Sequence, residues 1–193
     1  MPRLIRFIER GHGRRLRALS ATIVIAVTVT AFGVLAAQNK IRNLPGANVL
    51  DLTYTLTPDR EMTLNQTAFG GFCVRARNDG ESWYESPSGR VTLPDPHYSA
   101  PDLNWPRADW YAYGITLAGG KTLGCAVVDH PANPPATWHN PRYVWMINPC
   151  IVSGKPVTVE SGRALTLRYR VIVFDGPVPG PLVRQLSAEW RRA

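Results

Sequence analysis

The feature that most constrains the fold of this chain is a proline-rich segment between residues 125 and 150. It contains Pro131, Pro134, Pro135, Pro141 and Pro149. Proline donates no backbone hydrogen bond and fixes φ, so this segment forms neither a helix nor a central strand. The aliphatic run just before it, residues 123–128, has strand character. We therefore expect a strand that leads into a rigid polar loop.

Apolar and polar residues alternate with the period of two that is typical of half-buried strands, both before and after this loop. Residues 48–57 alternate, and residues 164–174 give the longest apolar stripe: Leu165, Leu167, Tyr169, Val171 and Val173. Arg168 and Arg170 fall on the opposite, polar face of this stripe. Residues 109–117 and 123–128 predict a hairpin across Gly119-Gly120.

The remaining segments complete an all-β prediction. Residues 78–107 are rich in Gly, Pro, Ser and Asp, and we expect a long irregular loop there, extended only at 90–93. Residues 181–192 carry apolar residues at helical spacing. The sequence thus predicts an antiparallel β-sandwich over residues 48–176, followed by a short C-terminal helix within residues 177–193.

The N-terminus has the composition of an export segment. Six arginines and one glutamate in residues 1–17 supply +5 of the net charge of +8, and residues 18–37 are an uncharged run of twenty. This fits a secretory signal cleaved after Ala36 or Ala37, or an uncleaved membrane anchor, and both place the body outside the cytoplasm. Residues 38–47 would then be a linker. A truncated gene product, in which residues 1–40 carry little meaning, is a third interpretation.

Charge and cysteine content narrow the classes of function. The charge left outside residues 1–17 is small and scattered, so we expect no nucleic-acid binding. The three cysteines, Cys73, Cys125 and Cys150, include no Cys-x-x-Cys pair, which argues against a zinc knuckle or a disulfide framework. A single bridge from Cys125 to Cys150 and three buried thiols remain open alternatives.

Asp129 and His130, together with His139, form the strongest chemical signal. A carboxylate at a strand end beside an imidazole can tune its pKa towards neutrality, which suits general acid–base catalysis. The same residues fit a structural hydrogen bond, and their spacing is weak evidence for a metal, so we predict no metal and no cofactor. Whether the chain is an enzyme stays open.

The aromatic, arginine and amide side chains around the loop are residue types found in carbohydrate-binding sites. Sugar rings stack on aromatic faces, and their hydroxyls form hydrogen bonds with polar side chains. The predicted ligand-binding residues are Arg75, Arg107, Trp110, Asn133, Trp138 and Asn148. The alternative is that these aromatics fill a small β core.

Four segments resemble the bacterial PmoA-like family of uncharacterised proteins: GGFCVRA, NWPRADWYAYG, DHPANP and ALTLRYRVIVFDG. The resemblance covers about residues 46–176 and implies the C-terminal portion of a mutarotase-like sandwich. The family name implies an oxygenase-associated role. A membrane copper oxygenase needs several spanning helices and a histidine cluster, whereas this chain has one apolar segment and four histidines. We rank that role last.

Two functional hypotheses therefore lead. The first is an exported β-sandwich that binds or processes a carbohydrate-like ligand. The second is a non-catalytic accessory module tethered to the membrane through residues 18–37. The first requires Asp129, His130 and Arg75 to line one partly open cleft, and the second does not.

Overall fold

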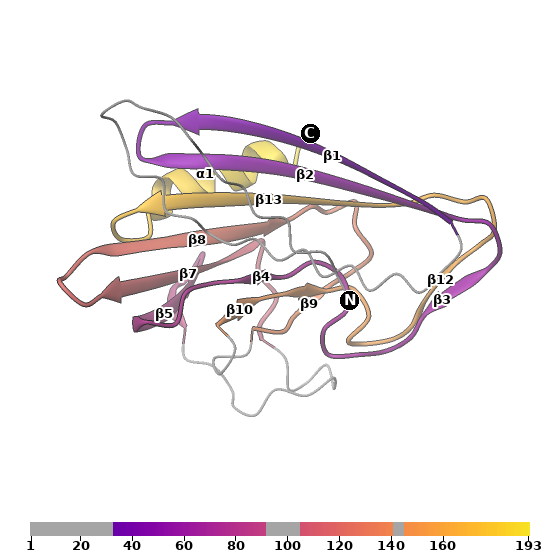
Figure 1. Cartoon of the computed structure of the whole chain (residues 1–193), viewed down its shortest axis with the longest axis horizontal. Coiled ribbons are helices and arrows are strands. Elements are labelled where there is room, and N and C mark those ends of the chain that lie inside the picture. Colours follow the sequence, from indigo (N-terminus) through magenta and orange to yellow (C-terminus); the bar gives the residue numbers. More distant parts are fainter. Residues whose placement is uncertain (1–32, 92–104, 141–144) are drawn as a thin grey trace.

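The computed structural model describes residues 33–91, 105–140 and 145–193, and its centre is an antiparallel sheet of seven strands (Figure 1). The strands lie in the order β1-β2-β13-β8-β7-β5-β6. Their bounds are β1 (Gly33–Leu44), β2 (Ala47–Pro58), β13 (Leu165–Asp175), β8 (Thr122–Asp129), β7 (Trp110–Leu117), β5 (Gly80–Ser86) and β6 (Gly89–Val91). The predicted hairpin is β7–β8.

One face of the sheet is covered by the single helix of the described residues, α1 (Gly180–Trp190). It begins at Gly180-Pro181, where a proline in the first turn has no intrahelical N–H bond to lose. Its buried residues are Val183, Leu186, Ser187 and Trp190, which lie on one stripe. They pack on Val49, Ala112, Val128, Ile172 and Phe174 of the sheet.

The other face of the sheet is covered by short two-stranded ladders (Figure 1). Three pairs form them: β4 (Val74–Arg75) with β10 (Met146–Ile147), β9 (Thr137–Trp138) with β11 (Pro149–Cys150), and β3 (Met62–Leu64) with β12 (Val157–Val159). Phe72, Val74, Trp138 and Ile147 of this layer pack against Leu52, Tyr111, Val127 and Tyr169 of the sheet. The predicted all-β antiparallel sandwich with a C-terminal helix is confirmed.

Strand β13 shows how the sequence pattern builds both layers. Tyr169 and Val171 face the short strands, as the alternation predicts, while Ile172 and Phe174 face α1. The central strand is therefore buried on both faces. Arg170 lies on the face opposite the apolar stripe, as predicted, but it is only 3% exposed because α1 covers it.

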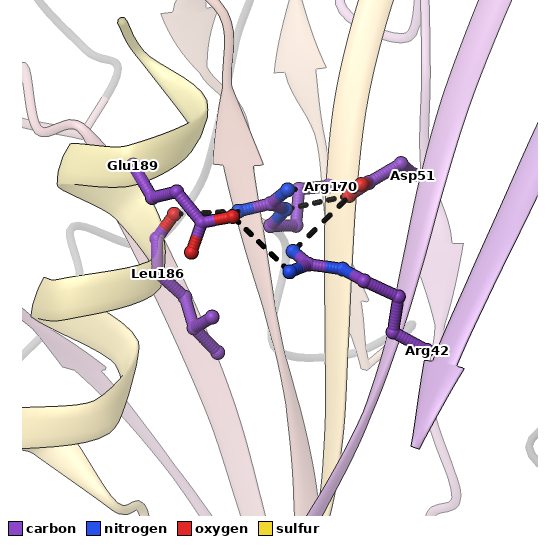
Figure 2. Close-up of polar contacts among 5 residues, drawn as sticks. All are labelled: Arg42, Asp51, Arg170, Leu186 and Glu189. Carbon is purple, nitrogen blue, oxygen red and sulfur yellow. Dashed lines mark hydrogen bonds and ion pairs between the residues drawn. The ribbon is translucent and has the colours of Figure 1, made fainter. Parts of the chain in front are cut away.

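Arg170 joins the helix to the sheet through a charge cluster (Figure 2). Its Nε and Nη2 donate to the two carboxylate oxygens of Asp51, at 2.5 and 2.9 Å, and its Nη1 donates to the carbonyl of Leu186 in α1 at 2.8 Å. The guanidinium also lies over the Trp190 ring, 4.7 Å from its centroid. Arg42 of β1 extends the cluster by donating to Glu189 at 3.1 Å.

Two sequence expectations are corrected. The last five residues of the apolar run and residues 38–44 of the expected linker lie in β1. Residues 45–46 form the turn into β2, and Ala47 is the first residue of β2. Gly33 lies opposite Pro58 and Leu44 opposite Ala47. Part of the loop expected over residues 78–107 is strand β5, which pairs with β7. Residues 1–32 of the proposed export segment, which spans residues 1–37, lie outside the described residues. In the part that is described, no helix is long and apolar enough to cross a membrane.

None of the three cysteines is in a disulfide. The pKa of the Cys125 thiol is raised to about 12 by complete burial. Cys150 lies between two backbone groups, because its Sγ accepts from the Gly70 N–H and donates to the Thr67 carbonyl, both at 3.3 Å. Cys125 and Cys150 are buried and Cys73 is half-buried, so the alternative of three buried thiols fits two of the three, and no Cys125–Cys150 bridge is present.

Candidate functional site

Asp129 and His130 lie at the end of β8 and point to opposite faces of the sheet. Asp129 follows the alternation of Val127, which faces the short strands, and His130 follows Val128, which faces α1. The His130 ring meets Trp190 of the helix edge to face, with centroids 5.4 Å apart. The two candidate catalytic side chains are therefore separated by the backbone of their own strand.

The Asp129 carboxylate anchors the start of the proline-rich loop. Its Oδ1 accepts from Asn133 Nδ2 at 2.7 Å. The Asn133 amide also donates to the Arg168 carbonyl and accepts from the Arg168 N–H, both at 2.8 Å. This side chain thus extends the ladder beside β13. Burial raises the pKa of Asp129 to about 6, although Asn133, Arg191 and the backbone N–H of His130 act to lower it.

His130 also has a structural role. Its Nδ1 accepts from the backbone N–H of Ala132 at 3.1 Å, and its carbonyl accepts from the N–H of Asn133 at 3.0 Å. An acceptor at Nδ1 places the proton of the neutral ring on Nε2. Burial, followed by the charges of Arg168 and Arg191, lowers the pKa of His130. The neutral imidazole therefore closes a turn at the loop entrance.

His139 lies in a buried network of amides. His139, Asn140 and Asn148 are all fully buried. The His139 N–H donates to the Asn148 carbonyl, and the Asn148 N–H donates to Asn140 Oδ1, both at 2.8 Å. Asn148 Nδ2 donates to the Phe72 carbonyl at 2.5 Å. These bonds replace the regular ladder that prolines deny this loop, and Asn140 is the member that sequence analysis missed.

The aromatic residues predicted to stack on a ligand lie in the two cores. Trp110 and Trp138 are each 2% exposed. Trp138 Nε1 donates to the Ala108 carbonyl at 2.8 Å, and its ring meets Tyr111 at 5.0 Å. The prediction that Trp110 and Trp138 offer open stacking faces is therefore wrong.

The predicted residues do not gather in one place. Arg75 and Arg107 are exposed on β4 and just before β7, whereas Asn133 and Asn148 are buried. Asp129 and His130 lie on different faces of the sheet. Among the residues that the structure describes, no group of three or more His, Cys, Asp or Glu side chains could hold a metal ion. The cleft required by the catalytic hypothesis is not formed by these residues.

The surface that sequence analysis missed is the outer side of β1. This strand has twelve residues and ends the sheet, with no further strand beside it in the described part of the chain. Leu35 and Ile41 on it are 46% and 71% exposed. We call the outer backbone edge of β1, with Leu35 and Ile41, the β1 surface. Sequence analysis missed this strand because Leu35 was assigned to the apolar run and Ile41 to the expected linker.

A family model matches residues 34–187, and its description is a family of unknown function, DUF6807. The chain belongs to DUF6807. No curated protein and no solved structure matches it. The DUF6807 match starts within β1 and ends within α1, so residues 34–44 of β1 belong to the family's domain. None of these comparisons tests the resemblance to the PmoA-like family, which stays a prediction.

Proposed function

We propose that this DUF6807 chain is a non-catalytic accessory module that works by binding another protein chain along the β1 surface. The observation that carries this proposal is the outer edge of β1, beside which no strand lies among the residues that the structure describes. An edge strand presents a row of unpaired N–H and C=O groups that can pair with another strand. Natural proteins shorten, bend or charge such edges. Strand β1 is long and has two charged residues, Lys40 and Arg42. Arg42 pairs with Asp51 and Glu189 in the charge cluster beside α1, which leaves Lys40 as the one charge outside that cluster.

The chemistry of the proline-rich loop supports the same proposal. Asn133, His130 and Asn148 each bond a backbone group, and Asp129 holds the Asn133 side chain in place. Buried backbone N–H and C=O groups need hydrogen-bond partners, and a side chain that supplies them stabilises the fold. The loop thus behaves as the second layer of the sandwich. Export directed by residues 1–37 is part of the proposal, since it would place the module outside the cytoplasm or at a membrane.

A second candidate function is binding of a carbohydrate-like ligand near Asp129. One observation favours it: a partly buried carboxylate with a pKa of about 6 can accept or donate a hydrogen bond near neutral pH. The ion pair between Arg191 and Asp109, at 3.2 Å, lies beside it, because Arg191 also donates to the Asp129 carbonyl at 3.4 Å. The oxygenase-associated role rests on the family resemblance alone.

Site-specific photo-crosslinking in living cells tests the proposed function. A photoreactive amino acid replaces Ile41 in the full chain, and a matched variant carries it at Phe69, which is 50% exposed but lies outside the β1 surface. The proposal expects a discrete protein adduct from position 41 and none from position 69. No adduct from position 41 would contradict it. Glycan titrations of the wild-type chain and Asp129→Asn test the second candidate, which requires binding that the substitution abolishes.

A further inference from the structure

We propose that the protein bound by the β1 surface is a second copy of this chain. In this arrangement the two β1 strands pair antiparallel about a two-fold axis at Gln38. The inference rests on the proposed function and names its partner. It follows from three properties of β1: the direction of its backbone groups, the position of its charges and the position of its exposed apolar side chains.

Backbone geometry limits the possible registers. In an antiparallel ladder, alternate residues direct both N–H and C=O towards the neighbouring strand. Because β1 pairs with β2 on one side, only every second residue has these groups free to point outward. In a symmetric pair, an outward-pointing residue must face another outward-pointing residue. The two-fold axis therefore passes through a residue of β1 and not between two residues.

The positive charges near the C-terminal end of β1 exclude a two-fold axis there. Lys40 and Arg42 are the charged residues of β1, and no acidic residue accompanies them. An axis at residue 40, 41 or 42 would set two positive side chains directly opposite each other, which destabilises a strand pair. An axis at residue 37, 38 or 39 avoids every such pair.

The apolar side chains select among the remaining axes. Leu35 and Ile41 are six residues apart and so share one face of β1. An axis at Gln38 places Leu35 opposite the partner's Ile41, and Ile41 opposite the partner's Leu35. An axis at 37 or 39 would instead set Leu35 opposite an asparagine. Only the Gln38 axis covers both exposed side chains with apolar ones, as the reciprocity of a two-fold interface requires.

The same register completes a row that already crosses the sheet. Leu35 lies opposite Leu56, which lies opposite Leu165, and Ile41 lies opposite Leu50, which lies opposite Val171. Pairing about Gln38 joins the row that ends at Leu35 in one copy to the row that ends at Ile41 in the other. Symmetry repeats this row, so two apolar rows run across the joined sheets. The exposed leucine and isoleucine become interior members of these rows.

Cysteine cross-linking of the full chain in mild detergent tests the register. Facing residues of an antiparallel pair have Cα atoms about 5 Å apart, within reach of a disulfide. Gln38→Cys should therefore form a covalent dimer on mild oxidation. Lys40→Cys is the matched control, because position 40 faces itself only when the axis lies at residue 40, where Ile41 would face Asn39 and not Leu35. The parent chain, treated in the same way, reports any cross-linking through its own cysteines.

Charge substitutions test the contact independently. The variant Leu35→Lys/Ile41→Lys sets like charges opposite each other twice, and should be a monomer by sedimentation equilibrium. The variant Leu35→Glu/Ile41→Lys sets opposite charges at the same two places, and should remain a dimer that dissociates as salt is raised. Both side chains are exposed, so we expect the two variants to fold like the parent.

The inference is overturned if the parent chain is a monomer at every concentration, if Lys40→Cys cross-links as well as Gln38→Cys, or if the two charge variants associate equally. The proposed function can survive that failure. A photo-adduct from position 41 with the mass of a different protein would support the docking module and reject the second copy. No adduct from position 41 would reject both.

Discussion

The buried ion pair between Asp51 and Arg170 gives the most quantitative prediction. Arg170 is almost fully buried and uses three nitrogens, two on Asp51 and one on the Leu186 carbonyl. Asp51→Ala would leave the buried guanidinium with only the half-exposed carboxylate of Glu189, 3.7 Å away, as an ionic partner. Removing one partner of a buried pair costs about 3–5 kcal/mol. Since domains of this size unfold with about 5–15 kcal/mol, much of the stability should disappear.

Urea unfolding followed by tryptophan fluorescence measures this cost, because Trp190 stacks on Arg170. The double variant Asp51→Leu/Arg170→Met replaces both charges with apolar groups and should recover most of the loss. Glu189→Gln is the surface control: its side chain is 47% exposed, so we expect a change of at most about 1 kcal/mol. A cost below 1 kcal/mol for Asp51→Ala, or no recovery in the double variant, would refute the reasoning that Arg170 pins α1 to the sheet.

Three further predictions concern stability and export. The pKa of Asp129 in the folded chain, about 6, lies above its ordinary value of 3.8, so the free energy of unfolding should fall as pH rises from 4 to 6. Asp129→Asn should remove this pH dependence. In urea unfolding at pH 7.5, the same variant should be more stable than the parent by up to about 3 kcal/mol. Gly124→Ala would press a Cβ against the backbone carbonyl oxygen of Tyr113 and place it 2.8 Å from the Phe174 ring, and should cost about 1–3 kcal/mol. Gly180→Ala, with 3.4 Å to its nearest neighbour, should change the same unfolding free energy by under about 0.5 kcal/mol. A reporter that is active only outside the cytoplasm, fused after Asn39, should be active in cells. Export would be contradicted if this reporter is inactive and is found wholly in the cytoplasm, with none in the membrane fraction.

Much of the fold could be predicted from local pattern. The period-two stripe of β13 and the glycine turn of the β7–β8 hairpin each specify an element without help from distant residues. Strand β5 could not be found this way. Its sequence, GESWYES, is mostly polar, and it is held by pairing with β7 and by the Tyr84 hydroxyl, which donates to the Met146 carbonyl at 2.9 Å.

The site was harder to predict because residue type does not report burial. Trp138 and His139 are types that serve equally well in a binding site and in a core, and the structure places both in the core. Neighbouring residues of a strand point to opposite faces, and the structure places Asp129 and His130 accordingly. For β1, the aliphatic start of the strand was read as part of an export segment, so its pairing with β2 was missed.

Hydrogen exchange of the β1 amides in the full chain tests the central claim most directly. If the β1 surface docks a strand, both the amides bonded to β2 and the outward-facing ones should be protected in the parent. In Leu35→Lys/Ile41→Lys, only the outward-facing half should exchange faster, by about tenfold or more. Outward-facing amides that exchange equally fast in the parent and in this variant would contradict the claim that β1 is a docking edge.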